Sequence, residues 1–218
     1  MFLLILSGIA VFFYGLWYFG KDLPDYKELS KYNPNVVTRI HAGNGALLAE
    51  YATQKRVFVP ISVIPKKVIN AFISAEDKDF YNHFGIDLMA TLRALITNVK
   101  NIGTNKRLIG ASTITQQVAK NFLLSSEMSY ERKIKEAILA IRIERAFTKN
   151  EILELYLNEI YLGFKSYGVA AAALNYFDKS LDNLDLSEVA FLAALPKAPN
   201  NYNPIYKTKQ AMMRRNWV

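Results

Sequence analysis

The first twenty residues, MFLLILSGIAVFFYGLWYFG, contain no charged side chain and constrain this chain most strongly. As a helix with a rise of 1.5 Å per residue, such a segment is about 30 Å long, which matches the hydrocarbon core of a bilayer. A cleavable signal peptide is the alternative, but the basic start is missing and YFGKDLP makes a poor cleavage site. We therefore predict that residues 1–20 form an uncleaved transmembrane anchor. The positive-inside rule gives no orientation, because no Lys or Arg precedes the segment.

The rest of the chain has the composition of a soluble domain and carries the whole net charge of +8. A basic excess beside a membrane span is typical of proteins that meet anionic headgroups or a phosphorylated substrate. Nucleic acid is disfavoured as a partner, because the basic residues are scattered through amphipathic helices and the anchor would hold the chain at a membrane. The sequence contains no cysteine, which excludes disulfides and thiolate metal sites.

The pattern beyond the anchor predicts a mainly helical domain with one small β element. Residues 21–36 are polar, contain two prolines and are predicted to be a linker, so the domain would occupy residues 37–218. Two β-rich runs flank Gly43-Asn44-Gly45, which indicates a hairpin. After the hairpin, apolar residues recur at the spacing of helices. The alanine-rich segment YGVAAAALNYF is expected to pack closely against other helices.

Residues that favour the ends of helices mark where these helices begin. Pro65 suits a first helical turn, Asp87 and Ser129 suit caps, and Ser112 is predicted to open the segment STITQQVAKNFLL. Thr148 with Glu151 forms a capping-box pattern before a helix expected to stop at Gly163, and Asp185 with Glu188 marks a further start. The expected apolar stripes are Val68, Ala71, Phe72 and Ala75; Leu88, Leu92, Leu95, Ile96 and Val99; and Ile114, Val118 and Phe122.

Two adjacent acids, Glu76 and Asp77, end one of these helices and are followed closely by Phe80, Tyr81 and His83. The other face of this helix is apolar, so partial desolvation would raise the pKa of Glu76 toward neutrality, as a general base requires. A solvated helix end is the structural alternative. His83 is expected to be a hydrogen-bonded structural residue, because no second histidine lies at the spacing of a metal site.

A further acid, Glu136, shares the segment ERKIKEAILAIRIE with two cations. On a helix, Arg132 and Lys133 precede it by four and three residues and are its neighbours. For this helix in isolation, an ordinary ion-pair ladder on the surface is the favoured interpretation. The residues of this helix expected to be buried are Ile134, Ala137, Ile138 and Ile141.

The segment Gly110-Ala111-Ser112-Thr113 precedes another predicted helix. Free backbone N–H groups and hydroxyls at such a start form a ready anion site, and Gln116, Gln117 and Lys120 extend a polar face along the helix. A simple N-cap is the alternative. The sequence contains neither a dinucleotide-binding glycine loop nor a P-loop.

Two glutamates in different surroundings, a helix start suited to phosphate and several cations beside a membrane anchor fit glycosyl transfer from a lipid pyrophosphate. The segments EDKDFYNHFGID, GASTITQQVAKN, ERKIKEAILAIRIE, KNEILELYLNEIYLG and YGVAAAALNYF resemble, in this order, the motifs of the family 51 peptidoglycan glycosyltransferases. Those enzymes form the N-terminal domain of class A penicillin-binding proteins or act alone as monofunctional transglycosylases. The resemblance runs from about Val37 to the end of the chain.

This resemblance implies a role for each matching residue. Glu76 would be the base that takes the proton from the 4-hydroxyl of the N-acetylglucosamine of lipid II, the acceptor. That oxygen attacks C1 of the growing glycan with inversion, and undecaprenyl pyrophosphate leaves. Glu136 would lie near the phosphates of the donor, where a divalent cation (Mg or Mn) is sometimes assigned, although no cofactor is required. The other residues implied in substrate binding are the pyrophosphate-binding cations Lys120, Arg132 and Lys133, the polar residues Ser112, Thr113 and Gln117, and Asp77, Phe80 and His83 of the first motif.

The resemblance also implies a mainly α, lysozyme-like domain with a membrane-facing jaw, anchored by one N-terminal transmembrane helix. The N-terminus would lie inside the bacterial cytoplasmic membrane and the catalytic domain outside it. The implied partners are lipid II, the growing glycan chain, membrane lipids and other cell-wall synthesis proteins. Family members continue beyond the final RRNWV, so we expect this chain to be part of a longer bifunctional protein.

Two positions depart from the family pattern. Met128 stands where many members carry arginine or lysine, and Asp178 replaces the glycine of the usual YFGK. If that glycine has a positive φ, aspartate can adopt it at some cost. Two rival functions remain at this point. A lytic transglycosylase or muramidase needs no pyrophosphate site, and an inactive membrane-anchored scaffold does not need both glutamates.

Overall fold

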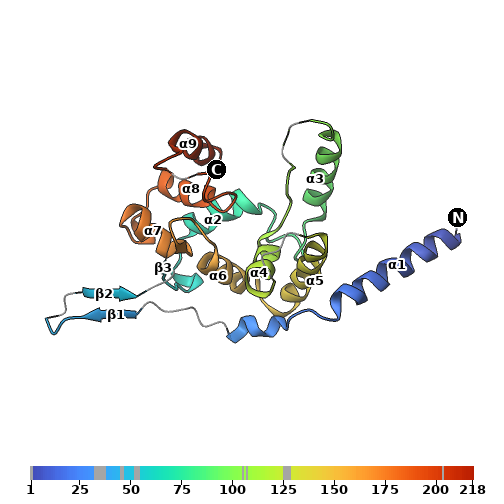
Figure 1. Cartoon of the computed structure of the whole chain (residues 1–218), viewed down its shortest axis with the longest axis horizontal. Coiled ribbons are helices and arrows are strands. Elements are labelled where there is room, and N and C mark those ends of the chain that lie inside the picture. Colours follow the sequence, from blue (N-terminus) through green and yellow to red (C-terminus); the bar gives the residue numbers. More distant parts are fainter. Residues whose placement is uncertain are drawn as a thin grey trace. The chain divides into compact units, whose positions relative to one another are not determined.

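The computed structural model describes residues 2–31, 38–44, 47–51, 55–104, 106, 108–124, 129–202 and 204–218. These residues are mainly helical, as predicted (Figure 1). The chain divides into two compact units. The first unit comprises Met1–Lys31 and Asn82–Thr148, and the second comprises Tyr32–Tyr81 and Lys149–Val218.

The first unit is helical in its described part. Its elements are α1 (Phe2–Gly20), η1 (Tyr26–Lys31), α3 (Leu88–Lys100), α4 (Ile114–Leu123) and α5 (Tyr130–Ala146). Helix α5 packs against α4 and also contacts α1 and η1 (Figure 1). Arg142 of α5 donates a hydrogen bond to the carbonyl of Gly20 at 3.1 Å. Within the described residues, none of the helices combines the length and the apolar character needed to cross a membrane.

The second unit combines helices with two small sheets. Its elements are β1 (Thr38–His41), β2 (Leu47–Tyr51), β3 (Lys55–Arg56), η2 (Ile61–Val63), α2 (Lys66–Glu76), α6 (Lys149–Glu159), β4 (Ser166–Tyr167), α7 (Val169–Phe177), η3 (Leu181–Asn183), α8 (Leu186–Ala194) and α9 (Thr208–Trp217). Strands β1 and β2 are antiparallel, which confirms the predicted hairpin, and β3 pairs with β4 in parallel. Helix α8 contacts α2, α7 and α9 (Figure 1).

Close packing around α7 and α6 holds the second unit together. Ala170–Ala173 of α7 are buried, as the alanine-rich segment predicted. Gly168 precedes α7 with φ +81°, and a Cβ there would lie 2.6 Å from the carbonyl oxygen of Asn158. The Asn158 side chain accepts from the N–H of Val59 at 2.8 Å and donates to its carbonyl at 2.9 Å. These bonds tie the segment before α2 to α6.

Most of the predicted helix starts are confirmed, and one is shifted. The side chains of Asp87, Ser129 and Asp185 each accept a hydrogen bond from a backbone N–H of the following helix. Helix α4, however, is capped by Thr113 and not opened by Ser112. Pro65 lies just before the first turn of α2, and α6 ends at Glu159, before the expected stop at Gly163.

The predicted buried face of α5 is wrong. Leu139, Ala140 and Ile143 are fully buried together with Glu136, whereas Ile134 is 38% exposed. The buried set is displaced by two residues from the predicted one, which is about 200° around the helix axis. Apolar residues occur on both sides of this helix, so their period alone does not identify the side that faces α4.

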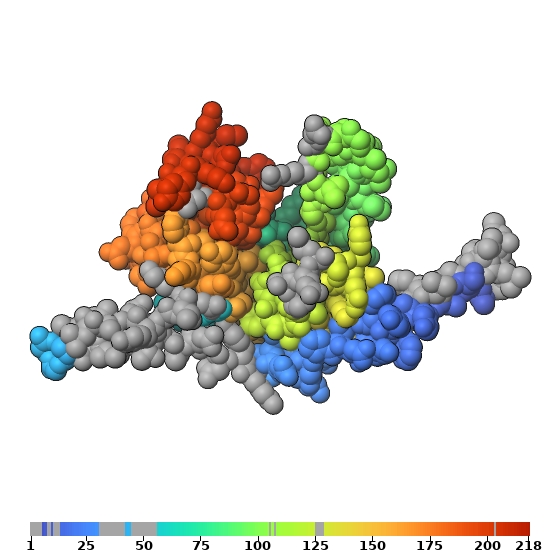
Figure 2. Space-filling view, viewed as in Figure 1, coloured from blue at the N-terminus to red at the C-terminus, as the bar shows by residue number. Residues whose placement is uncertain are grey.

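Helix α3 presents its apolar stripe to the surface of the first unit. Figure 2 shows the atoms of this segment, drawn in green, at the surface. The exposed side chains of the stripe are Leu88, Met89, Leu92, Leu95, Ile96 and Val99. Exposed apolar side chains on one helix indicate a surface that meets an apolar partner.

Candidate active site

The residues predicted to carry the chemistry are divided between the two units. Glu76, Asp77 and Phe80 belong to the second unit, and we call them the acid cluster. Ser112, Arg132, Lys133 and Glu136 belong to the first unit and contact one another, and we call them the cation cluster. The other predicted residues of the first unit are His83, Thr113, Gln117 and Lys120.

The acid cluster lies at the C-terminal end of α2. Glu76 is the last helical residue and is half-buried, whereas Asp77 is buried and its N–H donates to the carbonyl of Ile73 at 2.8 Å. Phe80 is fully buried and donates its N–H to the carbonyl of Asp77 at 2.9 Å. The ammonium of Lys149 lies 4.3 Å from the centre of the Phe80 ring, a cation–π distance. The buried ring therefore fixes the turn that follows the two acids.

Sequence reasoning missed a tyrosine beside these acids. Tyr156 of α6 is 1% exposed, and its ring lies edge-to-face with that of Phe72, with 6.4 Å between the ring centres. Burial, followed by the charges of Glu76 and Asp77, raises the pKa of the Tyr156 phenol well above its ordinary value. Nothing in the local pattern marks this residue, because it occupies an apolar position among buried leucines of α6.

The cation cluster is built around one buried carboxylate. Glu136 is 1% exposed, and its oxygens lie 3.1 Å from Nη1 of Arg132 and 2.5 Å from Nζ of Lys133. Lys133 also donates to the hydroxyl of Ser112 at 3.0 Å, while its side chain remains 49% exposed. The surface-ladder interpretation is therefore wrong for Glu136. Two cations around one carboxylate leave one net positive charge, with the Lys133 ammonium open to solvent.

A tight turn of the loop after the first motif is fixed beside this cluster. Thr113 is buried, and its hydroxyl donates to the carbonyl of Gly85 at 2.6 Å. Gly85 has φ +85°, and a Cβ there would lie 2.8 Å from the backbone of Ala140, one turn beyond Glu136 on α5. His83, two residues before Gly85, is half-buried. These contacts hold the loop against α4 and α5.

The start of α4 differs from the predicted anion site. Thr113 and Gln116 form a capping box, in which the side chain of each accepts the backbone N–H of the other. These bonds occupy two of the N–H groups that the prediction left for an anion. The pattern T-x-x-Q was the signal in the sequence for this cap. Gln117 and Lys120 follow on α4 and are half-buried.

The donors around Glu136 do not fit a divalent cation. Its carboxylate oxygens face Arg132 and Lys133, which take the place that a metal would need. Across the part of the chain that the structure describes, no three His, Asp or Glu side chains are grouped as ligands. We therefore derive no step of the chemistry through a metal.

One departure from the family pattern is explained by the backbone. Asp178 has φ +53° and ψ +38°, the left-handed conformation, and its N–H donates to the carbonyl of Leu174 at the end of α7. Asp178 thus adopts the positive φ that the sequence left open as one possibility for this position. Met128 lies outside the described residues.

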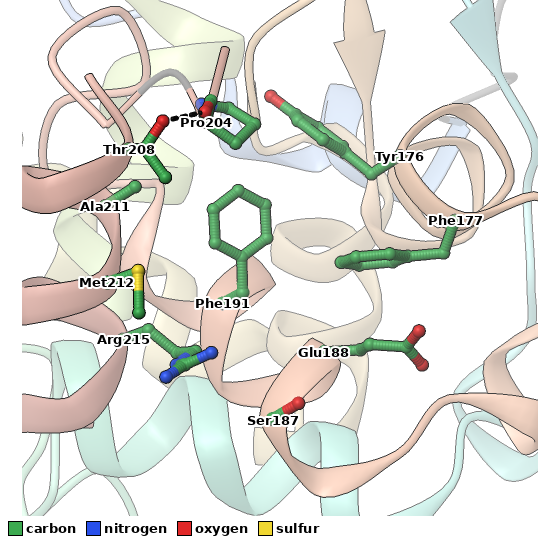
Figure 3. A pocket seen from close by; sticks show the side chains of 10 residues that line it. All are labelled: Tyr176, Phe177, Ser187, Glu188, Phe191, Pro204, Thr208, Ala211, Met212 and Arg215. Atoms are coloured by element: carbon green, nitrogen blue, oxygen red, sulfur yellow. Dashed lines mark hydrogen bonds between the residues drawn. The ribbon is translucent and has the colours of Figure 1, made fainter. Parts of the chain in front are cut away.

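A pocket among α7, α8 and α9 contains none of the predicted site residues. Its volume is about 260 Å³, and its lining includes Phe177, Phe191 and Met212, with Arg215 also present (Figure 3). The hydroxyl of Thr208 donates to the carbonyl of Pro204 at 2.6 Å at one end of this pocket. This pocket is thus separate in sequence from the acids and cations that the motifs predict.

Comparison with known proteins identifies relatives of the whole chain. Residues 44–218 match the family model described as Transglycosylase. The chain is 54% identical over 215 residues to penicillin-binding protein 1A of Rickettsia felis. This alignment covers 99% of the present chain and 27% of the Rickettsia protein. It is 49% identical over 218 residues to penicillin-binding protein 1A of Aquifex aeolicus, in an alignment that covers 98% of this chain and 30% of the Aquifex protein. A crystal structure of penicillin-binding protein 1A from Haemophilus influenzae aligns with 85% of this chain at 30% sequence identity and a TM-score of 0.43. The alignment covers 18% of the crystallised chain. The chain spans less than a third of the length of these relatives.

Proposed function

The chain belongs to the transglycosylase family, and we propose that it polymerises lipid II into glycan strands as a peptidoglycan glycosyltransferase. In this reaction Glu76 removes the proton from the 4-hydroxyl of the acceptor N-acetylglucosamine. The resulting oxygen attacks C1 of the N-acetylmuramic acid at the reducing end of the growing chain. The bond from C1 to the pyrophosphate oxygen breaks with inversion, and undecaprenyl pyrophosphate leaves with the negative charge.

The cation cluster is the observation that carries this proposal. A leaving pyrophosphate gains negative charge in the transition state, and a cation already held in place stabilises that charge without reorganisation. Glu136 and Ser112 hold the Lys133 ammonium from one side, while half of its side chain stays exposed. A lytic transglycosylase releases no pyrophosphate, so its reaction does not need a cluster of cations. That rival and the inactive scaffold are therefore not favoured.

We further propose that the domain has the lysozyme-like arrangement of its family. Two features of the described residues support this. The fold is mainly helical, and Glu76 ends a helix whose apolar face is buried through Val68, Phe72 and Ile73. A base in this position is held by the rigid end of α2 and the fixed turn at Phe80.

The proposed location is the surface of the bacterial cytoplasmic membrane, with the N-terminus inside and the domain outside. The substrate carries a long polyprenyl tail, so the reaction has to take place beside a bilayer. Two observations support a membrane-facing side of the first unit. The apolar stripe of α3 is exposed, and the ammonium of Lys21 lies 5.6 Å from the ring of Trp17 and 5.4 Å from that of Tyr18, a grouping typical of membrane interfaces. Residues 1–20 remain the predicted anchor on the strength of their sequence.

The test is to incubate the purified chain with labelled lipid II in vesicles and, separately, with finished glycan strands. Polymer formed from lipid II, with release of undecaprenyl pyrophosphate, is the expected result. Cleavage of finished strands without polymerisation would replace the proposal with the lytic rival. Binding without either reaction would support the scaffold.

A further inference from the structure

The buried hydroxyl of Tyr156 has a position that packing alone does not explain. The side chain is 1% exposed, and within the described residues no group forms a hydrogen bond with its oxygen. A buried hydroxyl without a partner costs free energy, whereas phenylalanine would fill nearly the same space without that cost. An unpaired polar group inside a protein therefore calls for an explanation beyond packing.

The surroundings of Tyr156 point to the acid cluster. Its ring contacts that of Phe72, which precedes Glu76 by four residues and so lies on the same side of α2, one turn earlier. The charges coupled to the phenol are those of Glu76 and Asp77, and together with burial they keep its pKa well above the ordinary value. The hydroxyl is therefore neutral at any working pH and has a proton to donate.

We propose that Tyr156 is a positioning residue for the general base, and that its hydroxyl donates a hydrogen bond to the Glu76 carboxylate, directly or through one water, when the acceptor sugar is bound. This inference rests on the proposed function. The half-buried Glu76 side chain needs a fixed direction once the acceptor hydroxyl is in reach. A hydrogen bond from the neutral Tyr156 hydroxyl would fix the direction of the Glu76 carboxylate and stabilise its ionised form.

A phenol suits this task better than a cation. Arg132 and Lys133 both form ion pairs with Glu136. In general, cations beside a carboxylate favour its ionised form and so make it a weaker acceptor for a substrate proton. The phenol supports the charge of Glu76 with a single hydrogen bond and leaves the carboxylate basic. After proton transfer the phenol faces a neutral acid, so it favours loss of the proton and return of the base.

Other charged groups near Tyr156 have partners of their own. On α6, the ammonium of Lys149 lies over the Phe80 ring, and Glu154 accepts the N–H of Ile61 at 2.7 Å. On α8, which packs against α2, Glu188 is bonded to Lys179 at 2.7 Å. The electrostatic coupling of the phenol is to the two carboxylates of the acid cluster.

The test compares Tyr156→Phe with Tyr176→Phe in the full chain. We expect Tyr156→Phe to unfold at the same or a higher temperature, because it removes an unpaired hydroxyl. Its kcat on lipid II should fall about tenfold with KM unchanged. Because the ionised form of Glu76 loses a donor, the acidic limb of the pH profile of kcat, which reports the substrate complex, should move upward by about one pH unit.

Tyr176→Phe is the matched control. Its hydroxyl donates to the carbonyl of Leu162 at 2.7 Å, and it lies in the same unit as Tyr156. This variant should lose stability and keep the kcat and the pH profile of the original chain. The two substitutions thus remove the same atom and are expected to have opposite effects on stability and activity.

A second readout separates this inference from the proposed function. The carboxyl of Glu76 can be titrated by NMR in labelled protein saturated with N-acetylglucosamine, the acceptor sugar, whether or not the chain polymerises lipid II. An upward shift of its midpoint in Tyr156→Phe supports the inference even if polymerisation fails. An unchanged midpoint overturns it, as does a shift confined to Asp77. A fall in kcat with an unmoved acidic limb would also overturn it and leave Tyr156 a structural role.

Discussion

The surroundings of Glu76 in the second unit differ from those of Glu136 in the first unit. In the second unit, Glu76 is half-buried at a helix end, and its charge acts on the phenol of Tyr156. In the first unit, Glu136 is fully buried in the middle of α5 and is held by Arg132 and Lys133. In the proposed reaction the first acid is the base, whereas the second holds two cations in place. We therefore propose proton transfer for the glutamate of the second unit and support of phosphate-binding cations for that of the first.

Both units expose apolar side chains, and those of the second unit include Leu186, Ile205, Tyr206 and Trp217. The second unit buries the apolar side of α2 and the alanines of α7. The first unit exposes the apolar stripe of α3, together with half of the Lys133 side chain. A lipid pyrophosphate needs an apolar surface for its tail and cations for its phosphates. The first unit contains both kinds of group.

The largest expected effect comes from removing the base. Glu76→Gln keeps the shape and the hydrogen-bonding capacity of the side chain but cannot accept the proton. Turnover of lipid II should fall by about 10²–10⁴-fold, the usual contribution of a general base, with the unfolding temperature unchanged. Polymerisation at a near-normal rate would remove Glu76 from the mechanism and end the contrast between the two acids.

Removing the second acid should act on stability as well as on activity. Glu136→Gln leaves Arg132 and Lys133 without their charged partner, and the unfolding free energy should fall by about 3 kcal/mol. This is the lower end of the range for a broken buried pair, because Lys133 is half exposed and can regain water. Chemical denaturation and turnover of lipid II measure the two effects.

The matched control for this variant is Glu144→Gln on the same helix. Glu144 accepts the hydroxyl of Thr115 at 2.7 Å, and glutamine can accept the same bond. Its stability and turnover should therefore stay close to those of the original chain. Equal losses of stability and turnover in both variants would show that α5 does not tolerate glutamine at either position. Such a result would contradict a special role for Glu136.

A smaller effect should follow when the exposed cation is removed. Lys133→Ala is expected to weaken binding of a phosphoglycolipid inhibitor of the moenomycin type by about 10- to 100-fold, the value of one hydrogen bond to a charged group. Titration calorimetry measures this affinity. Lys135→Ala is the control, because Lys135 pairs with Glu131 on the same helix at 2.6 Å. Unchanged affinity in Lys133→Ala would assign the phosphate to another part of the chain.

The smallest effect concerns the surface of α3. Leu92 is 50% exposed, so Leu92→Glu should leave the fold intact and reduce binding to anionic vesicles about fivefold, which corresponds to about 1 kcal/mol of lost apolar burial. Vesicle sedimentation at fixed salt checks this. Leu186→Glu is the control, since Leu186 is exposed at the start of α8 in the second unit. Equal losses in both variants would show that the effect is one of charge and not of α3.

Local sequence signals predicted much of this molecule, because they act over a few residues. Asp87, Ser129 and Asp185 were recognised as caps, since a cap needs only its own side chain and the next turn. The hairpin of β1 and β2 follows from a similarly short pattern. The five motifs together predicted the family, which the match over residues 44–218 confirms. The ion pairs of Glu136 with Arg132 and Lys133 were also predicted, because residues three and four apart are neighbours on a helix.

Contacts between elements decided the rest. The spacing of α5 could not show that Glu136 is buried, because both sides of that helix carry apolar residues and only its packing against α4 selects one. The apolar stripe of α3 was predictable as a stripe, but its exposure depends on which neighbours the fold leaves beside it. Tyr156 lies 80 residues beyond Glu76 and looks like one more apolar position of α6. Only the folded chain shows that its ring packs on Phe72 and that the charges of Glu76 and Asp77 act on its phenol, since burial and electrostatic coupling depend on tertiary contacts.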